Sequence, residues 1–253
     1  MPIHYDTQDG VATFTIDNGR LNLFTMAMHE SFHRYYLQFM HDDSIKVGVI
    51  TGHGNNFCAG ADLNESDTEI KARSKPRWDE MTLSYARAKP MISAVEGYCF
   101  GEGLLYLMLL TDIRIADENL IIGAPEIAYG MGGMSGATHM GSQIPYVQAA
   151  YLVLTGEKLT ADKALKMNLV NEVVPVNQSL VRAQEIARKI ASHPLISVKT
   201  EMDCLLRSTE LSRLDSLNHT MKQYMTQRQF HLVNGVNALS DFDKTTQSTG
   251  EEK

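Results

Sequence analysis

A strand, a glycine-rich turn and a wholly apolar helix follow one another between residues 91 and 112. Residues 91–95 form a short apolar run, which is typical of a buried strand. Gly101 and Gly103 allow a sharp turn, and residues 104–110 are apolar on every side, as a helix inside a core would be. Because this helix begins at glycines, its first amides are exposed and could bind an oxygen that gains negative charge. A tight turn without chemistry is the alternative interpretation.

A second turn, also made of small residues, follows another apolar strand. Residues 47–51 predict that strand, and the small residues 59–61 after it would let a ligand lie against the main chain. Asp62 followed by Glu65 matches a capping box, so a helix is expected to begin there. One exposed amide from each turn would together make an oxyanion hole.

The paired turns resemble those of the crotonase (enoyl-CoA hydratase/isomerase) superfamily. Its members carry an Ala-Gly-Ala-Asp turn and then a Gly-Tyr-Ala-x-Gly-Gly-Gly turn. The matching segments here are Ala59-Gly60-Ala61-Asp62 and Gly97-Tyr98-Cys99-Phe100-Gly101-Glu102-Gly103. Three more segments match in the same order: Ala124-Pro125-Glu126, Leu154-Thr155-Gly156 and Asn168-Leu169-Val170-Asn171-Glu172-Val173-Val174-Pro175. One such motif would be a weak signal, whereas five in order are a strong one.

The resemblance implies an α/β fold, a crotonase-type spiral of ββα repeats. The alternation of strands and helices along the chain independently favours α/β architecture. We expect the spiral core over residues 1–192 and a C-terminal helical region with a polar tail over residues 193–253. In the superfamily such helices pack on neighbouring subunits, which predicts a homotrimer or a hexamer made of two trimers. Apolar residues that could form these contacts are Met202, Leu205, Leu206, Leu211, Leu214 and Leu217.

Periodicity and turn residues predict the remaining elements. They are a hairpin over residues 3–16, helices over 26–40, 62–88, 135–142, 145–155, 161–167, 177–192 and 195–230, and strands over 112–116, 119–123 and 169–175. Thr160 is placed to cap the helix that begins at residue 161.

Charge and composition argue against several classes of function. The net charge of -7 disfavours nucleic-acid binding, and the longest apolar run, residues 104–110, is too short to cross a membrane. The first residues lack the basic and apolar regions of an export signal. The three cysteines have no CxxC spacing, so we expect free thiols, a cytoplasmic location, and packing roles for Cys58 and Cys99.

His29 and His33 are four residues apart, as metal ligands can be. The sequence offers no acidic or cysteine partner for them, so a helix face is the favoured interpretation and no metal is expected. The resemblance likewise implies no cofactor beyond the coenzyme A of the substrate thioester.

The resemblance also implies the binding residues. The segment around Leu21 and Leu23 matches a loop that helps hold coenzyme A in relatives. The expected contacts with the acyl-CoA are Leu21, Leu23, Ala59, Gly60, Asp62, Leu63, Tyr98, Gly101, Gly103, Leu105 and Gly133. Trp78, Met81 and Tyr85, at helical spacing, could line the acyl pocket or merely pack.

For catalysis, the amides of Ala61 and Glu102 are expected to bind the thioester oxygen, although relatives have glycine at the position of Glu102. Hydratases of the superfamily use two glutamates. The first would fall on Leu105, or on Tyr106 by a count from Asp112, and neither is acidic; the second is present as Glu126.

Moving a double bond along an acyl chain needs a single base, which Glu126 supplies, so the sequence favours an enoyl-CoA isomerase. Three alternatives stay open: an enoyl-CoA hydratase or lyase that uses Glu102, a carbon–carbon bond (diketone) hydrolase with His139 near the site, and a non-catalytic acyl-CoA binder.

Overall fold

The computed structural model describes residues 2–65, 87–133 and 138–234. Trp78, Met81 and Tyr85, most of the helix predicted over 62–88 and the polar tail lie outside these ranges. Met1–Val198 and Lys199–Lys253 form two compact units. The division into domains at residue 192 stays a prediction.

A six-stranded sheet forms the centre of the first unit. Its strands lie in the order β1 (Ile3–Gln8), β2 (Val11–Ile16), β3 (Val47–Gly52), β4 (Met91–Val95), β6 (Ile113–Asp117) and β9 (Glu172–Val174). The β1–β2 pair is the predicted antiparallel hairpin, and every later neighbour is parallel. The strands expected from their apolar runs are therefore confirmed.

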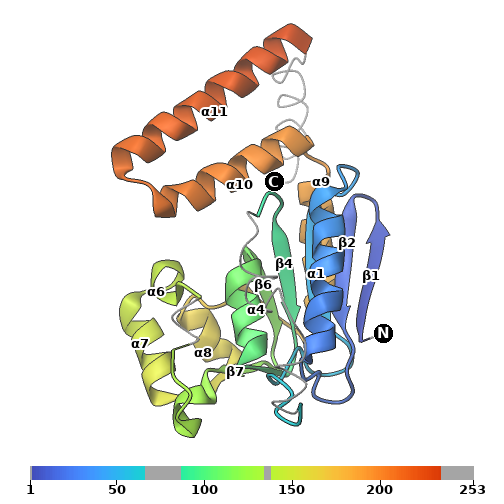
Figure 1. Ribbon diagram of the computed structural model, residues 1–253, viewed down its shortest axis with the longest axis vertical. Helices are drawn as coiled ribbons and strands as arrows, with labels where there is room; N and C mark the ends of the chain where they lie inside the picture. The colour runs from blue at the N-terminus through green and yellow to red at the C-terminus, as the bar shows by residue number, and fades with distance from the viewer. Residues whose placement is uncertain (1, 66–86, 134–137, 235–253) are drawn as a thin grey trace, which may run out of the picture. The chain divides into compact units, whose positions relative to one another are not determined.

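Helices cover both faces of this sheet. Along β3, Val47 and Val49 pack in the cluster that contains the alanines of α9 (Ser179–Ala191), whereas Ile50 packs in the cluster that contains α1 (Met26–His41). Successive side chains of a strand point to opposite faces, so both faces need apolar residues. This explains the uninterrupted apolar run in β3. Figure 1 shows α1 alongside β1 and β2.

A smaller sheet leads to the remaining helices of the first unit. It consists of β5 (Tyr98–Phe100), β7 (Ile121–Gly123) and β8 (Leu159–Thr160). In the described part of this unit the remaining helices are α4 (Glu102–Leu110), the 3-10 helix η1 (Pro125–Tyr129), α6 (Met140–Gln143), α7 (Tyr146–Thr155) and α8 (Ala161–Lys166). Nearly all of α4 is buried, as its apolar sequence predicts, and Figure 1 shows it close to β4 and β6.

Three local predictions need correction. The helix expected over 135–142 begins only at Met140 among the described residues. Thr160 occupies the N-cap position of α8, but its side chain makes no capping hydrogen bond. Glu65 does not form a capping box with Asp62: its carboxylate accepts from the amide of Met26 at 3.0 and 3.1 Å. The Phe24–Ala61 bridge brings Glu65 to the N-terminus of α1, where a free amide and the helix dipole attract a carboxylate.

The second unit holds most of α10 (Leu195–Glu210) and all of α11 (Arg213–Asn234). The helical segment predicted over 195–230 is thus two helices. His219 Nε2 of α11 lies 2.5 Å from Asp203 Oδ2 of α10. None of the helices in the described ranges is both long and apolar enough to cross a membrane.

Candidate active site

Backbone hydrogen bonds hold the two small-residue turns side by side. The amide of Phe57 donates to Glu96 O at 2.8 Å, and the amide of Cys58 donates to Tyr98 O at 2.9 Å. Phe100 N donates to Cys58 O at 3.0 Å. The chain leaving β3 therefore pairs with the chain leaving β4, which fixes the geometry of the residues that follow each of them.

Glycine is required where the turns meet. A Cβ atom on Gly103 would lie 2.5 Å from Cys58 O, closer than any side chain could approach. Gly101 has a φ of 52°, in the region that favours glycine, and its added Cβ would lie 3.6 Å from Gly60 Cα. Burial raises the pKa of Cys58 to about 12 and also raises that of Cys99, so both thiols stay protonated and serve as packing residues, as predicted.

The predicted coenzyme loop is attached to the first turn. The amide of Ala59 donates to Leu21 O, and the amide of Phe24 donates to Gly60 O, both at 2.9 Å. The buried Asn22 side chain stabilises the loop by donating hydrogen bonds to His53 O and Asn56 O. These contacts place Leu23 at the edge of the site.

The two amides expected to form an oxyanion hole are available. Within the described chain, no backbone hydrogen bond occupies the amide of Ala61. Glu102 is the first residue of α4 after its N-cap Gly101, and the first amides of a helix have no partner inside it. Both residues line the same cavity, where the positive end of the α4 dipole adds to their attraction for a negative oxygen.

This cavity has a volume of about 480 Å³ and lies between the turns, η1 and the start of α4. Its lining is Leu23, Ala59, Gly60, Ala61, Leu63, Asn64, Phe100, Gly101, Glu102, Leu105, Pro125, Glu126, Tyr129, Met131 and Lys158. Most of the predicted site residues meet here, including the three proposed for catalysis. Asn64, Tyr129 and Lys158 were not predicted, because their sequence neighbourhoods carry no signal that separates a pocket residue from a surface residue.

Several predicted contacts do not line this cavity. They are Leu21, Asp62, Tyr98, Gly103 and Gly133. Tyr98 lines a separate surface cavity with Arg20 and Asn55, and Gly103 is buried against Cys58 because it serves the packing of the turns. His139 is exposed and is also absent from the lining, so nothing in the geometry favours the hydrolase alternative.

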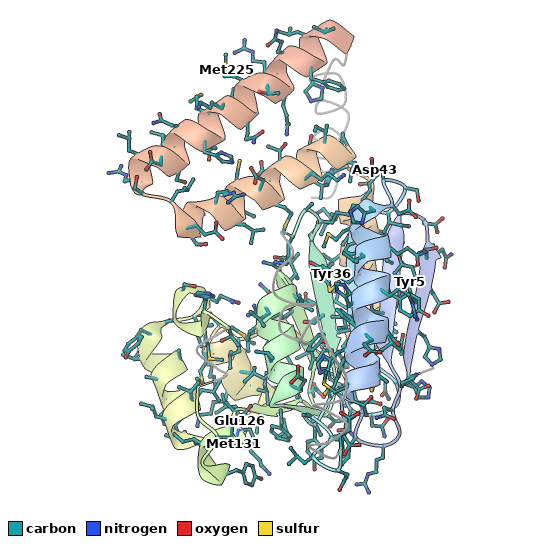
Figure 2. All side chains as sticks on the ribbon, viewed as in Figure 1. Tyr5, Tyr36, Asp43, Glu126, Met131 and Met225 are labelled. Atoms are coloured by element: carbon teal, nitrogen blue, oxygen red, sulfur yellow. The ribbon has the colours of Figure 1, made fainter. Side chains whose placement is uncertain are left out.

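Pairing in the small sheet brings Glu126 to the glycine turn. Tyr98 and Phe100 of β5 pair with Ile121 and Gly123 of β7, and η1 follows directly. A Cβ on Gly101 would lie 3.3 Å from Glu126 Oε1. Figure 2 labels Glu126 in η1 and Met131 just after it, and both line the cavity. Glu126 therefore stands beside the proposed oxyanion donors.

Glu102 brings a second carboxyl group into the cavity. Its side chain is only 10% exposed, and within the described ranges its buried Oε1 has no hydrogen-bond partner. Burial, and secondarily the negative charge of Glu126, raise the pKa of Glu102 to about 8. This increase favours the protonated form of Glu102 at neutral pH.

The two positions at which the sequence comparison expected the first hydratase glutamate, Leu105 and Tyr106, have different surroundings. Leu105 lines the cavity, whereas Tyr106 is buried and its hydroxyl lies 2.7 Å from His29 Nδ1. Glu102 and Leu105 are three residues apart and so share one face of α4. A carboxyl group on residue 102 can therefore reach the region that one on residue 105 would occupy.

His29 lies next to Glu102. Burial lowers its pKa to about 4, which keeps the ring neutral, and its Nε2 lies 3.9 Å from Glu102 Oε1. Among the described residues, no group of three or more His, Cys, Asp or Glu side chains could hold a metal ion.

The chain is similar to known proteins over most of its length. Residues 6–242 match the enoyl-CoA hydratase/isomerase family. The 2,3-dehydroadipyl-CoA hydratase of Escherichia coli (strain K12) is 37% identical over 177 residues, which are 68% of each chain. Mevalonyl-coenzyme A hydratase sidH of Aspergillus fumigatus is 32% identical over 212 residues, 79% of this chain and 76% of that protein.

The fold is shared with solved structures of enoyl-CoA hydratases. The enoyl-CoA hydratase of Bacillus anthracis superposes with a TM-score of 0.83 at 25% sequence identity, and the match covers 97% of both chains. The predicted α/β fold class is confirmed, and the structure shows it as a mixed α/β fold with two sheets and C-terminal helices.

Proposed function

Because this chain belongs to the enoyl-CoA hydratase/isomerase (crotonase) family of enzymes, we propose that it adds water to the double bond of a 2-enoyl-CoA thioester or catalyses the reverse dehydration. Glu126 and Glu102 act as the acid–base pair, and the amides of Ala61 and Glu102 bind the thioester oxygen. The reaction requires no cofactor beyond the coenzyme A of the substrate.

One observation carries this proposal: two carboxyl groups from different elements line one cavity, and burial favours the protonated form of one of them. Hydration needs a base that takes a proton from water and an acid that gives a proton to carbon. The negative charge of Glu126 suits the first role, and the raised pKa of Glu102 suits the second. The sequence favoured a double-bond isomerase in which Glu126 is the single base and Glu102 contributes mainly its amide. The present proposal takes hydration in place of that reaction.

The chemistry follows from these positions. Glu126 takes a proton from a water molecule, and the water oxygen bonds to the β-carbon of the enoyl group. The electron pair of the double bond moves to the thioester oxygen, where the two amides stabilise the resulting enolate. The enolate collapses as its α-carbon takes the proton of Glu102. A proton passed from Glu126 to Glu102 through solvent restores both groups.

Two relatives named above are called hydratases, which supports water addition over double-bond migration. Their printed substrates differ, 2,3-dehydroadipyl-CoA for one and a mevalonyl-CoA for the other. The proposal accordingly specifies the 2-enoyl-CoA group and leaves the acyl chain to experiment.

The test is incubation of the purified protein with a panel of 2-enoyl-CoA and 3-enoyl-CoA thioesters, followed by liquid chromatography that separates the two isomers and by mass spectrometry of each product. Hydration adds the mass of one water, whereas isomerisation leaves the mass unchanged in ordinary water. We expect 2-enoyl-CoA to gain water. Conversion of 3-enoyl-CoA to 2-enoyl-CoA without any hydrated product would support the isomerase instead, and binding without conversion would support the non-catalytic alternative.

A further inference from the structure

Glu102 is a buried acid whose enclosed oxygen faces a side chain that the proposed mechanism does not use. His29 is 4% exposed and projects from α1, a helix distant in sequence from α4. Its Nε2 is 3.9 Å from Glu102 Oε1, slightly beyond hydrogen-bonding distance. Because that oxygen has no hydrogen-bond partner among the residues that the structure describes, a small movement of the carboxyl group towards the ring would satisfy it.

Tyr106 fixes the orientation of the His29 ring. The phenolic oxygen lies 2.7 Å from Nδ1, and the ring also packs against Phe24 and Tyr106. A phenol is a better hydrogen-bond donor than a neutral imidazole, so we assign the tautomer in which Tyr106 donates to Nδ1. The proton of His29 is then on Nε2, the nitrogen that faces Glu102.

We infer that His29, held by Tyr106, is a positioning residue that orients the carboxyl group of Glu102 through Oε1 and leaves the other carboxyl oxygen to face the substrate. This inference rests on the proposed function, since it assigns a role to the acid of that reaction. It also accounts for the placement of a buried carboxyl group at the first position of α4.

The charge balance around Glu102 defines what His29 contributes. Burial and Glu126 of η1 favour the neutral acid. The buried Cys58 thiol lies close to Glu102 from the first turn, and Lys158 lines the same cavity. An N–H from His29 stabilises the carboxylate that forms when the proton is delivered, so it keeps the group able to ionise during turnover.

Infrared spectroscopy of the whole protein tests this without relying on activity. The C=O band of protonated Glu102 is the band that Glu102→Gln removes, and its loss on raising pH reports the pKa of the group. In His29→Phe, we expect the midpoint to rise by about 1 pH unit, because the carboxylate loses its donor. Tyr106→Phe should shift the midpoint in the same direction but by less, since the ring stays and only its orientation loosens.

His33→Phe is the matched control, because it makes the same change one turn along α1, and we expect no shift. An unchanged or lowered midpoint in both His29→Phe and Tyr106→Phe would overturn the inference.

A double-mutant cycle separates positioning from general structure. His29→Phe should lower kcat of hydration about tenfold, less than the ~10²–10⁴-fold of losing an acid or base, with KM nearly constant. In the Glu102→Gln background, His29→Phe should cause no further decrease in kcat. An equal decrease in kcat in both backgrounds would contradict the inference. If the parent hydrates no thioester, the proposed function fails, while the infrared midpoints still decide the role of His29.

Discussion

The negative charge of Glu126 raises the pKa of Glu102, although the two glutamates come from different elements. Burial is the larger cause of that increase and Glu126 the second. A carboxyl group beside a negative charge ionises less readily, because its ionisation places like charges together. One base and one acid near neutral pH are what water addition requires.

Replacing Glu126 with Gln should remove the base and keep the shape of the side chain. We expect kcat to fall by ~10²–10⁴-fold, the usual contribution of general acid–base catalysis, with KM nearly unchanged. Steady-state kinetics on a 2-enoyl-CoA thioester would check this. A variant that turns over at the parent rate would exclude Glu126 from the mechanism.

Two substitutions at Glu102 separate the role of its carboxyl group from that of its amide. Glu102→Gln and Glu102→Gly both keep the backbone amide but lose the acid, and we expect each to lose hydration by ~10²–10⁴-fold. If only the amide works, Glu102→Gly should keep or raise activity, because it restores the residue found in relatives. Kinetics of the two variants side by side would decide between these roles.

The rate should depend on pH through Glu102. Because the pKa of Glu102 in the ligand-free protein is about 8 and the reaction uses its acid form, we expect kcat/KM to fall as the pH rises through about 8. A pH profile of kcat/KM measures this decline. A parent enzyme whose kcat/KM stays level through that range would argue against Glu102 as the acid.

Stability should also depend on pH, with a sign set by the same group. The carboxyl group of Glu102 has a pKa of about 8 in the folded protein, against its ordinary value of 4.5. Unfolding therefore releases a proton between these values, and the free energy of unfolding falls as the pH rises from 4.5 towards 8. Glu102→Gln removes this term, so Tm of the variant relative to the parent should be higher at pH 8 than at pH 5. Calorimetry at the two pH values would measure the difference, and an equal Tm difference at both would refute the assignment.

Gly103 should not tolerate a side chain. An added Cβ would lie 2.5 Å from Cys58 O and would push apart the two turns that carry the oxyanion donors. We expect Gly103→Ala to lower both Tm and kcat. Gly141→Ala is the matched control in a helix, because its Cβ would meet the Tyr146 ring at an ordinary 3.5 Å. Equal behaviour of the two variants would show that the contact between the turns can relax.

The predicted trimer or hexamer depends on apolar side chains of the C-terminal helices. Leu205, Leu214 and Leu217 are 63%, 67% and 61% exposed, whereas Met202 is buried and cannot contribute. We expect sedimentation of the parent protein to show a trimer or hexamer. The double variant Leu214→Asp/Leu217→Asp should sediment as a smaller assembly. Asn218→Asp, which adds charge at an exposed polar position of the same helix, serves as the control. A parent that sediments as a monomer at micromolar concentration would contradict the prediction.

The sequence by itself determined the family, the fold class, and the meeting of Ala61, Glu102 and Glu126 in one site. These predictions depend on local signals, namely the periodicity of apolar residues, the glycines of the two turns and the order of the motifs along the chain. The close approach of Gly103 to Cys58 explains why that signal is strong, since the backbone contact admits no side chain.

Only the tertiary structure decided what Glu102 and its surroundings can do. Its burial, the charge of Glu126 nearby and the position of His29 arise from η1 and α1, which the chain order does not place against α4. Glu65 is a second case that the sequence could not predict. Its carboxylate accepts from the amide of Met26, whereas the local motif predicted a capping box with Asp62. A pKa and a hydrogen-bond partner depend on the packing of residues distant in sequence, and local patterns contain no information about that packing.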